Sequence, residues 1–357
     1  MQTQMAHDGA DRERTGTSVS LMGRGEERMW DLYVQKNPNG TFCHLSGWKQ
    51  IIENVFGHRT YYLIARQGSA VVGVLPLTHI RSLLFGNALI SNAFCVYGGP
   101  LAETEAAYAA LEAEAIAISK RVGAGYLEFR SLLSRHADWP QKRDLYVTFR
   151  KTIDPDPATN MKAIPRKQRA MVRKGIANGL LSEIDADVGR LHHVYAESVR
   201  NLGTPVFPKR LFRALKAQFG DACDIVTVLD HGNAVASVMN FYFRDEVMPY
   251  YGGGVSAARA LAANDFMYWE VMRRACERGY RTFDFGRSKV GTGSYDFKRY
   301  WGFEPTPLIY EYQLGTAKSI PDNSPLNPKY RLFIEVWKRL PLPLTKLLGP
   351  IVVKGTG

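Results

Sequence analysis

The stretch "MPYYGGGVSAARALAANDFMYWEVMRRACERGYRTFDFGRS", residues 248–288, predicts a strand, a glycine-rich bend, a helix and a second strand, in that order. Asn264 can cap the start of the helix and Gly279 can end it. Apolar and aromatic side chains recur at helical spacing along one face of this helix: Tyr268, Val271, Met272, Ala275 and Cys276. Because a helical crossover joins parallel strands, the two strands are expected to run parallel. The stretch therefore predicts an α/β unit.

The first half of the chain repeats this order. A strand-like run "VVGVLPLTHI" (71–80) precedes the bend "FCVYGGP" (94–100), the helix "ETEAAYAALEAEAIAISKRVG" (103–123) and the strand "YLEFRS" (126–131). Prolines and aspartates in "KTIDPDPATN" (151–160) interrupt any periodic pattern and mark a boundary. We therefore expect a mixed α/β (α+β) chain with two duplicated domains in tandem, residues 25–152 and 153–315.

The composition is that of a folded protein with room for two domains: 357 residues, of which 45% are hydrophobic and 22% charged. A net charge of +12 favours anionic partners such as nucleic acid, phosphorylated substrates or an acidic membrane face, although a basic surface can also be inert. The polar residues 1–24 predict a disordered tail and no signal peptide. No apolar run is long enough to span a membrane.

The cysteines and histidines indicate a reduced, cytoplasmic protein without a metal site. No C-x-x-C pair and no zinc-like histidine spacing occurs, and His192 and His193 are adjacent, so they cannot both face one metal from a helix. The four cysteines are far apart in the sequence: Cys43, Cys95, Cys223 and Cys276.

A basic helix is expected directly after the boundary. Residues 158–182 contain six Lys or Arg and no acidic residue. Pro165 suits the first turn of the helix and Gly179 its end. Four cations line one face: Lys162, Arg166, Arg169 and Arg173. Such a run is either a solvated face or an anion site, and the absence of acids favours the anion site.

The glycine-rich segment "GRSKVGTGSYDFKRYWGFEP" (286–305) matches neither of the familiar phosphate-binding motifs. Gly286 and Gly291 have the spacing of a P-loop, but Thr292 and Gly293 stand where Lys and Ser/Thr are required. Asp296 stands where a dinucleotide fingerprint needs its third glycine. We interpret the segment as a strand end, a flexible turn and an aromatic helix.

Three segments resemble the FemAB family of aminoacyl and acyl transferases, which have two tandem GCN5-related N-acetyltransferase (GNAT) domains. "RKQRAMVRKGIANGL" (166–180) is similar to the basic helix of the family, and "VYAESVRNLGTPVFPKRLF" (194–212) to the helix and Pro-aromatic turn that follow it. "GSYDFKRYWGF" (293–303) is similar to the Phe-Lys-x-x-aromatic-Gly motif. The resemblance covers residues 28–315 and implies a BioF2-like catalytic second domain. Residues 283–312 are similar to the branch associated with PEP-CTERM/exosortase and exopolysaccharide systems.

The resemblance implies transfer of an acyl or aminoacyl group to an amine, with Lys298 in the acceptor site. A fixed cation there stabilises an acceptor phosphate or the oxyanion that develops at the reacting carbonyl. The alternative is that Lys298 only lies over Tyr300 and Trp301. The residues expected to bind substrate are Arg166, Arg169, Arg173, Arg200, Tyr250, Tyr251, Arg287, Ser288, Tyr295 and Phe297.

Two carboxylates flank the motif. Asp284 and Glu304 are candidates for the general base that deprotonates the acceptor amine, or else they pair with neighbouring arginines. Tyr250 and Tyr251 precede three glycines at a strand end, where they either contact substrate or belong to the core.

The donor is expected to be aminoacyl-tRNA or acyl-CoA, with no tightly bound cofactor. GNAT proteins that use CoA carry a [RQ]-x-x-G-x-[GA] loop whose amides cradle the pyrophosphate, but the glycines of "GGGVSAARALAAND" (252–265) come too early. The coiled coil with which some Fem proteins grip tRNA is also absent from this sequence. A non-catalytic RNA-binding or scaffold protein of the same fold is the alternative from another class.

The tail at residues 316–357 contains a predicted amphipathic helix with basic residues around it. Tyr330, Phe333, Ile334 and Trp337 recur at helical spacing, and "LPLPLTKLLGPIVV" (340–353) continues the apolar surface. Such a helix either lies in an anionic membrane interface or docks on the second domain. We therefore expect a cytoplasmic transferase, peripheral to the inner face of the cell membrane under the first alternative. It would form an amide on a cell-envelope or exopolysaccharide precursor whose acceptor amine bears a phosphate.

Overall fold

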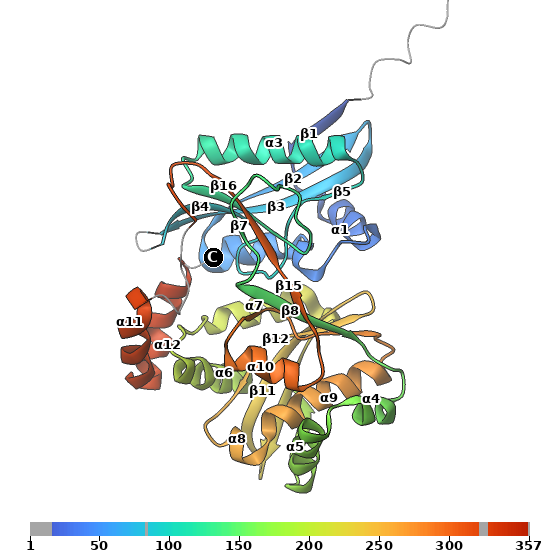
Figure 1. Ribbon diagram of the computed structural model, residues 1–357, viewed down its shortest axis with the longest axis vertical. Coiled ribbons are helices and arrows are strands. Elements are labelled where there is room, and N and C mark those ends of the chain that lie inside the picture. The colour runs from blue at the N-terminus through green and yellow to red at the C-terminus, as the bar shows by residue number, and fades with distance from the viewer. Residues whose placement is uncertain (1–15, 83–84, 321–327, 356–357) are drawn as a thin grey trace, which may run out of the picture.

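The computed structural model describes residues 16–82, 85–320 and 328–355. Within them the chain forms two mixed sheets, one above the other in Figure 1, each with helices against its faces. The strand order of the first sheet is β1–β2–β3–β4–β6–β16–β7, with β5 beside β3. The strand order of the second is β14–β8–β13–β12–β11–β10–β9, with β15 beside β8.

The first sheet and its helices are built almost entirely from the first half of the chain. Its strands are β1 (Thr17–Leu21), β2 (Arg59–Gln67), β3 (Ala70–Ser82), β4 (Gly86–Ser91), β5 (Leu101–Ala102), β6 (Tyr126–Ser131), β7 (Gln141–Lys142) and β16 (Ile309–Leu314). Its helices are α1 (Glu27–Lys36), α2 (Gly47–Ile51) and α3 (Glu105–Arg121). The alanine-rich α3 begins where Thr104 accepts a hydrogen bond from the Ala107 N–H (3.2 Å), as an N-cap does.

The second sheet has the strands β8 (Tyr146–Thr152), β9 (Leu181–Ile184), β10 (Cys223–Asp230), β11 (Asn233–Phe243), β12 (Glu246–Gly254), β13 (Thr282–Asp284), β14 (Ser288–Lys289) and β15 (Pro305–Pro307). The helices that follow β8 are α4 (Pro157–Ala163), α5 (Arg166–Ala177), α6 (Gly189–Leu202), α7 (Lys209–Phe219), α8 (Ala258–Leu261), α9 (Ala263–Glu277), α10 (Gly293–Tyr300), α11 (Pro328–Arg339) and α12 (Leu342–Val353).

The strands on either side of each long helix are parallel, as predicted. β4 pairs with β6 in parallel across α3, and β12 pairs with β13 in parallel across α9. Gly279 ends α9 with a φ of +84°, which favours glycine. The start of α9 differs from the prediction, because Ala262 precedes the helix and Asn264 lies inside its first turn without capping it.

Two strands cross the predicted domain boundary. β8 lies before residue 153 but pairs with β13 in the second sheet, and β16 lies after β15 but pairs with β6 in the first sheet. The predicted ranges 25–152 and 153–315 therefore mix strands of the two sheets. The pairing partners of β8 and β16 are distant in the sequence, so the alternation of apolar and polar side chains along each strand does not reveal them.

The two domains share a hydrophobic core. Phe42 of the first domain stacks on Phe241 of the second with ring centroids 4.2 Å apart, and Trp48 packs against Phe219 at 5.8 Å. Apolar burial on this scale resembles the interior of one domain more than a contact between mobile ones. The two sheets are therefore held in a fixed relation.

The two ends of the described chain differ from the predicted tails. Residues 17–21, inside the predicted disordered tail 1–24, form β1 at the edge of the first sheet beside β2. Residues 1–15 lie outside the described residues. α11 and α12 pack against α6, with Trp337 only 3% exposed and Gly349 against Val206. Among the described residues no helix is long and apolar enough to cross a membrane.

Candidate active site

The parallel strands β12 and β13 pair only at their first residues and then part. Glu246 faces Thr282 and Val247 faces Phe283. Beyond these pairs β12 continues to Gly254, whereas β13 ends at Asp284. Tyr250 bulges from β12, because Met239 faces Tyr251 whereas Asn240 faces Pro249. A bulged strand that diverges from its parallel neighbour leaves backbone groups free for a ligand.

The loop of residues 92–99 from the first domain covers this opening. After β4 the chain leaves the first sheet through Asn92 and Phe94, which both have positive φ angles. The Tyr250 hydroxyl donates to the Phe94 carbonyl oxygen (3.1 Å), and the Tyr97 hydroxyl donates to Asp284 (2.9 Å). We call this region, formed by residues 92–99, 248–251 and 284–288 with Tyr146 and Tyr310, the interdomain site.

Residues 160–299 match the acetyltransferase (GNAT) domain family. The match contains β12, α9, β13 and all but the last residue of α10, and thus both sides of the opening. The second domain is accordingly a GNAT acyltransferase domain, which confirms the predicted class of enzyme. No curated protein sequence matches the chain.

Solved structures share the arrangement of both domains. FemX has a TM-score of 0.65 and 14% identity, and the match covers 89% of this chain and 100% of FemX. A tandem GNAT protein from the clavulanic acid biosynthesis pathway has a TM-score of 0.53 and 12% identity, with 86% and 100% coverage. L-PGS from Bacillus licheniformis has a TM-score of 0.50 and 13% identity, with 89% and 99% coverage. These likenesses confirm the predicted fold of two tandem GNAT-like domains.

Asp284 lies where the two strands of the GNAT domain part, and it is fully buried. Its carboxylate accepts hydrogen bonds from the hydroxyls of Thr148 (2.8 Å) and Tyr97 (2.9 Å) and from the N–H of Gly286 (2.7 Å). Burial raises the pKa of Asp284 against the effect of these hydrogen bonds. Because both oxygens are engaged, this geometry suits a positioning residue that ties the first domain to the second. Its predicted role as a general base stays a prediction.

Arg150 links Asp284 to a second buried carboxylate. Its guanidinium forms an ion pair with Glu246, and its Nε lies 3.6 Å from Asp284 Oδ2. Burial, with a contribution from the charge of Asp284, raises the pKa of Glu246 to about 7. Two carboxylates that share one arginine form a network that can take up a proton near neutral pH.

Lys298 lies on α10 with its side chain beneath the interdomain site, 8% exposed. Its Nζ donates to the carbonyl oxygens of Phe285 (2.7 Å), Gly286 (2.9 Å) and Arg287 (3.2 Å). Burial lowers the pKa of Lys298 to about 7. An ammonium has three N–H groups, and these carbonyls use all of them. Lys298 therefore positions the turn at residues 285–287, and its predicted contact with the acceptor stays a prediction.

Arg287 is the cation that this turn presents to the interdomain site. Its side chain is exposed to solvent. Its Nη1 donates to the Tyr310 hydroxyl (3.0 Å), and the guanidinium lies over the Tyr146 ring at 4.7 Å. The Tyr310 hydroxyl in turn donates to the Val96 carbonyl oxygen (3.1 Å). A stacked, oriented guanidinium with N–H groups to spare is suited to bind an anion.

Two hydroxyls of the site are buried without a hydrogen-bond partner among the described residues. They are those of Tyr251, whose ring packs against Tyr195 and Phe212, and Ser288 in β14. Arg287 is close enough to Tyr251 to lower its pKa, which burial raises well above 10. Buried hydroxyls without partners at a candidate site indicate groups that a ligand can satisfy.

The remaining predicted site residues lie elsewhere. Tyr295 packs edge-on against Phe149, and Phe297 packs against Tyr268, so both belong to the packing of α10. Glu304 is exposed and forms no ion pair with any described residue. Arg200 donates to the Leu340 carbonyl oxygen at 3.5 Å and so contacts the tail.

The basic helix α5 forms as predicted but is not part of the interdomain site. It packs on α9 at the end of the second domain remote from the first (Figure 1). Arg166 and Arg173 are exposed, and Arg169 donates to the Lys162 carbonyl oxygen (2.8 Å). The structure therefore does not bring these arginines together with Lys298 around one phosphate.

As an exposed basic surface, α5 predicts a salt-dependent contact with a polyanion. Replacing Arg166, Arg169 and Arg173 by Gln is expected to reduce the slope of log affinity for tRNA against log salt by roughly 2–3, because each neutralised phosphate contributes about 0.7–0.9. Titrations of fluorescent tRNA at several salt concentrations measure this slope. An unchanged slope would show that α5 is only solvated. The matched control replaces three exposed basic residues of the first domain: Arg24, Arg28 and Lys36.

The loop between β12 and α9 does not form a cradle for a pyrophosphate. Most of its N–H groups donate to protein acceptors within 3.3 Å, in part because α8 closes a helical turn there: Val255, Ser256, Ala258, Leu261 and Ala262. The buried carboxylate of Asp265 lies in the first turn of α9, where it accepts hydrogen bonds from Gln168 and Trp301. An anion at this helix end would meet that carboxylate.

Sequence reasoning missed several residues that build the interdomain site. Tyr97, Thr148, Arg150, Glu246 and Tyr310 come from four different strands or loops, and no motif joins them. One signal was available, because Tyr97 belongs to the repeated Tyr-Gly-Gly element. Among the described residues no cluster of His, Cys, Asp and Glu is suited to hold a metal ion.

Proposed function

We propose that this protein is a FemAB-type transferase that moves an acyl or aminoacyl group to an amine of a cell-envelope or exopolysaccharide precursor. The observation that carries the proposal is Arg287, an accessible guanidinium oriented by Tyr310 and Tyr146 at the opening between β12 and β13. Its charge suits a phosphate of the acceptor or the oxyanion of the reaction. The resemblance of residues 283–312 to proteins of PEP-CTERM/exosortase systems supports this class of acceptor.

The reaction forms one amide bond and breaks one ester or thioester bond. The acceptor nitrogen attacks the donor carbonyl carbon, the carbonyl oxygen gains negative charge, and the leaving oxygen or sulfur departs with the electron pair. A fixed cation beside the carbonyl oxygen stabilises that charge in the transition state. The amine proton passes to a base, for which the carboxylates of Asp284 and Glu246, joined by Arg150, are the candidates at the interdomain site.

For the donor, the loop after β12 favours aminoacyl-tRNA over acyl-CoA. Most of the N–H groups with which a GNAT loop would hold a pyrophosphate are occupied within the protein, and Asp265 adds a negative charge nearby. The exposed basic face of α5 offers a surface for the tRNA backbone. The second candidate is an acyl-CoA-dependent N-acyltransferase, which the match to the acetyltransferase (GNAT) family favours.

Thermal unfolding with each donor separates these candidates. We expect a non-hydrolysable aminoacyl-tRNA to raise the melting temperature by several degrees, and acetyl-CoA at the same concentration to leave it unchanged. Uncharged tRNA is the control. Protection by acetyl-CoA alone would establish the acyl-CoA candidate. Equal protection by charged and uncharged tRNA, without transfer of labelled amino acid, would indicate an RNA-binding protein that is not an enzyme.

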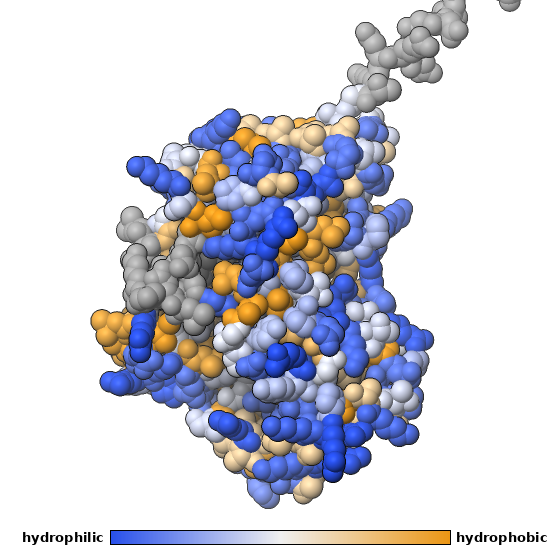
Figure 2. All heavy atoms as spheres, in the orientation of Figure 1, coloured by the Kyte–Doolittle hydropathy of each residue, from blue (hydrophilic) through white to orange (hydrophobic). Residues whose placement is uncertain are grey.

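The proposed localisation is cytoplasmic, with the tail in peripheral contact with the inner face of the cell membrane. One face of α11 and α12 docks on α6, while the other exposes apolar side chains, which Figure 2 shows gathered over these helices. The exposed residues are Leu332, Phe333, Val336, Leu344, Leu347 and Ile351. The two interpretations of the tail are therefore compatible, because the docked face and the exposed face are different. The side chain of Tyr330, which was predicted to belong to the apolar face, is not among those that the structure describes.

A further inference from the structure

A basic hollow lies on the first domain, and His58 in its lining packs against Phe94 of the interdomain site with ring centroids 6.0 Å apart. It has a volume of about 450 Å³ and lies where the start of β2, the end of β3 and the end of α12 meet. The described residues that line it include no acid: Gly57, His58, Arg59, Tyr61, His79, Arg81, Val122 and Lys354.

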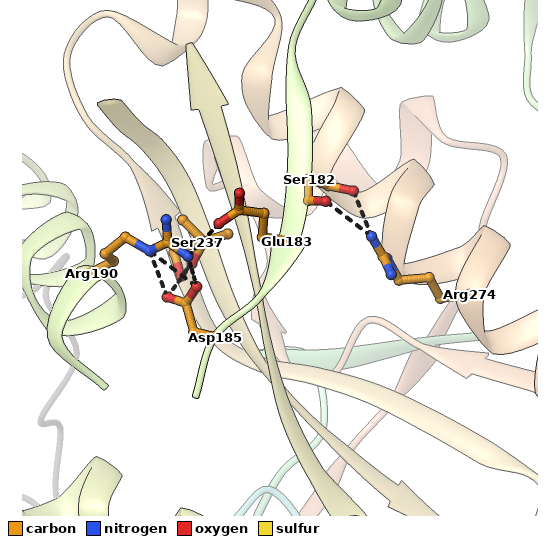
Figure 3. A network of polar contacts seen from close by, with 7 residues as sticks. Ser182, Glu183, Asp185, Arg190, Ser237 and Arg274 are labelled. Carbon is orange, nitrogen blue, oxygen red and sulfur yellow. Dashed lines mark hydrogen bonds and ion pairs between the residues drawn. The ribbon is translucent and has the colours of Figure 1, made fainter. Parts of the chain in front are cut away.

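The cations of this hollow are not neutralised by the protein. Arg59, Arg81 and Lys354 form no ion pair with any residue that the structure describes. A larger hollow of about 670 Å³ beside α6 differs in this respect. There Arg190 pairs with Asp185 and Glu183, as Figure 3 shows, so that the charge is already balanced. Of these two hollows, the basic one has positive charge left for a ligand.

Local structure explains why these side chains converge. Arg59 faces His79 across the β2–β3 pair, and Arg81 follows two residues later, so strand alternation places all three on one face. His58 Nε2 hydrogen-bonds to the Lys354 carbonyl oxygen (2.7 Å), which ties the end of α12 to the first domain. The cations are therefore held together by the sheet register and by this contact.

We propose that the basic hollow binds the phosphate group of an anionic phospholipid. This inference deepens the peripheral membrane contact proposed above and rests on it. The apolar face of α12 ends beside the hollow, because Ile351 (72% exposed) and Leu347 (68% exposed) lie about one and two turns before Lys354. A bilayer surface offers apolar chains and phosphates side by side, and each basic residue near it adds to the attraction. Free phosphate shares the chemistry but would not engage the apolar face.

Phosphate binding in this hollow is expected to take up protons. Burial and the charge of Lys354 lower the pKa of His58. Burial also lowers the pKa of His79, and the charges of Arg81 and Arg59 add to this effect. Asn87 of β4 contacts the His79 ring, and Val122, the residue directly after α3, adds an apolar side chain to the lining. A bound anion favours the protonated imidazoles, so affinity rises as the pH falls from 7.5 to 5.5. Sulfate is a suitable probe because its own charge is constant over this range.

Flotation with vesicles of phosphatidylglycerol and phosphatidylcholine tests the proposal with the full chain. Arg59→Gln/Arg81→Gln is expected to weaken binding to the anionic vesicles about tenfold or more, and Lys36→Gln, an exposed charge on α1, to leave it within twofold. Leu347→Ser/Ile351→Ser is expected to weaken binding as well. Wild-type protein is expected to bind inorganic phosphate and sulfate at millimolar concentrations, with sulfate bound more tightly at pH 5.5 than at pH 7.5. The Arg59→Gln/Arg81→Gln variant is expected to bind neither anion at these concentrations.

Each other outcome excludes a specific part of the proposal: the lipid, the hollow or the membrane contact. Binding of phosphate without binding of anionic vesicles would exclude the lipid as its source. Vesicle binding that depends on Leu347 and Ile351 but not on Arg59 and Arg81 would preserve the membrane contact and exclude the hollow. No binding of either probe would exclude both, while the donor experiment would still stand as an independent test of the transferase.

Discussion

The Lys298→Met variant is expected to lose both stability and turnover. Methionine has a similar length but no donor, so the carbonyl oxygens of residues 285–287 lose their common partner in a buried position. Loss of a buried charged donor costs about 2–4 kcal/mol of unfolding free energy, which corresponds to roughly 3–5 °C in melting temperature for a chain of this length. Because this turn carries Arg287, turnover is expected to fall at least tenfold.

Calorimetry and single-turnover transfer assays measure the two effects separately. The matched control is Arg299→Met on the same helix, since Arg299 is exposed and forms no ion pair with a described residue. A variant with normal melting and lost turnover would show that Lys298 acts on the substrate directly. A normal melting temperature together with normal turnover would show that Lys298 neither positions the turn nor acts in the reaction.

The Arg287→Met variant is expected to lose turnover without losing stability. Removing one oriented donor to a developing oxyanion typically costs about 100- to 1,000-fold in rate. The side chain is accessible to solvent, so its melting temperature should stay within about 2 °C of that of the wild type. Arg287→Lys keeps the charge but cannot reproduce the stacked, planar fork, and it is expected to recover only part of the rate.

Rapid-quench measurement of amide formation checks this expectation, with Arg281→Met, an exposed arginine just before β13, as the control. Acceptor binding distinguishes the two roles of the guanidinium. If it binds an acceptor phosphate, KM rises and the rate at saturation is retained; if it stabilises the oxyanion, kcat falls. Wild-type values of both would exclude Arg287 from the reaction.

The sequence alone determined the local elements and their order. The basic helix at residues 166–177 and the helix at 263–277 were predicted from side-chain periodicity and from Gly279, because those signals act within a few residues. The repeated Tyr-Gly-Gly element predicted two similar domains. The helices depend on local backbone preferences, which short stretches of sequence carry, whereas the class of enzyme was implied by the resemblance of the motif around Lys298 to the FemAB family.

Only the tertiary structure decided which strands pair and which side chains meet. The alternation in β8 and β16 does not show that β8 joins the second sheet and β16 the first, because strand pairing is a long-range choice. That exchange brings Tyr310 to Arg287 and Thr148 to Asp284. Lys298 donates to the carbonyl oxygens of residues 285–287, while Arg287 in the same turn is exposed to solvent. The motif predicted where a site would lie, but burial and hydrogen bonding, which depend on the whole fold, decided which groups each charge contacts.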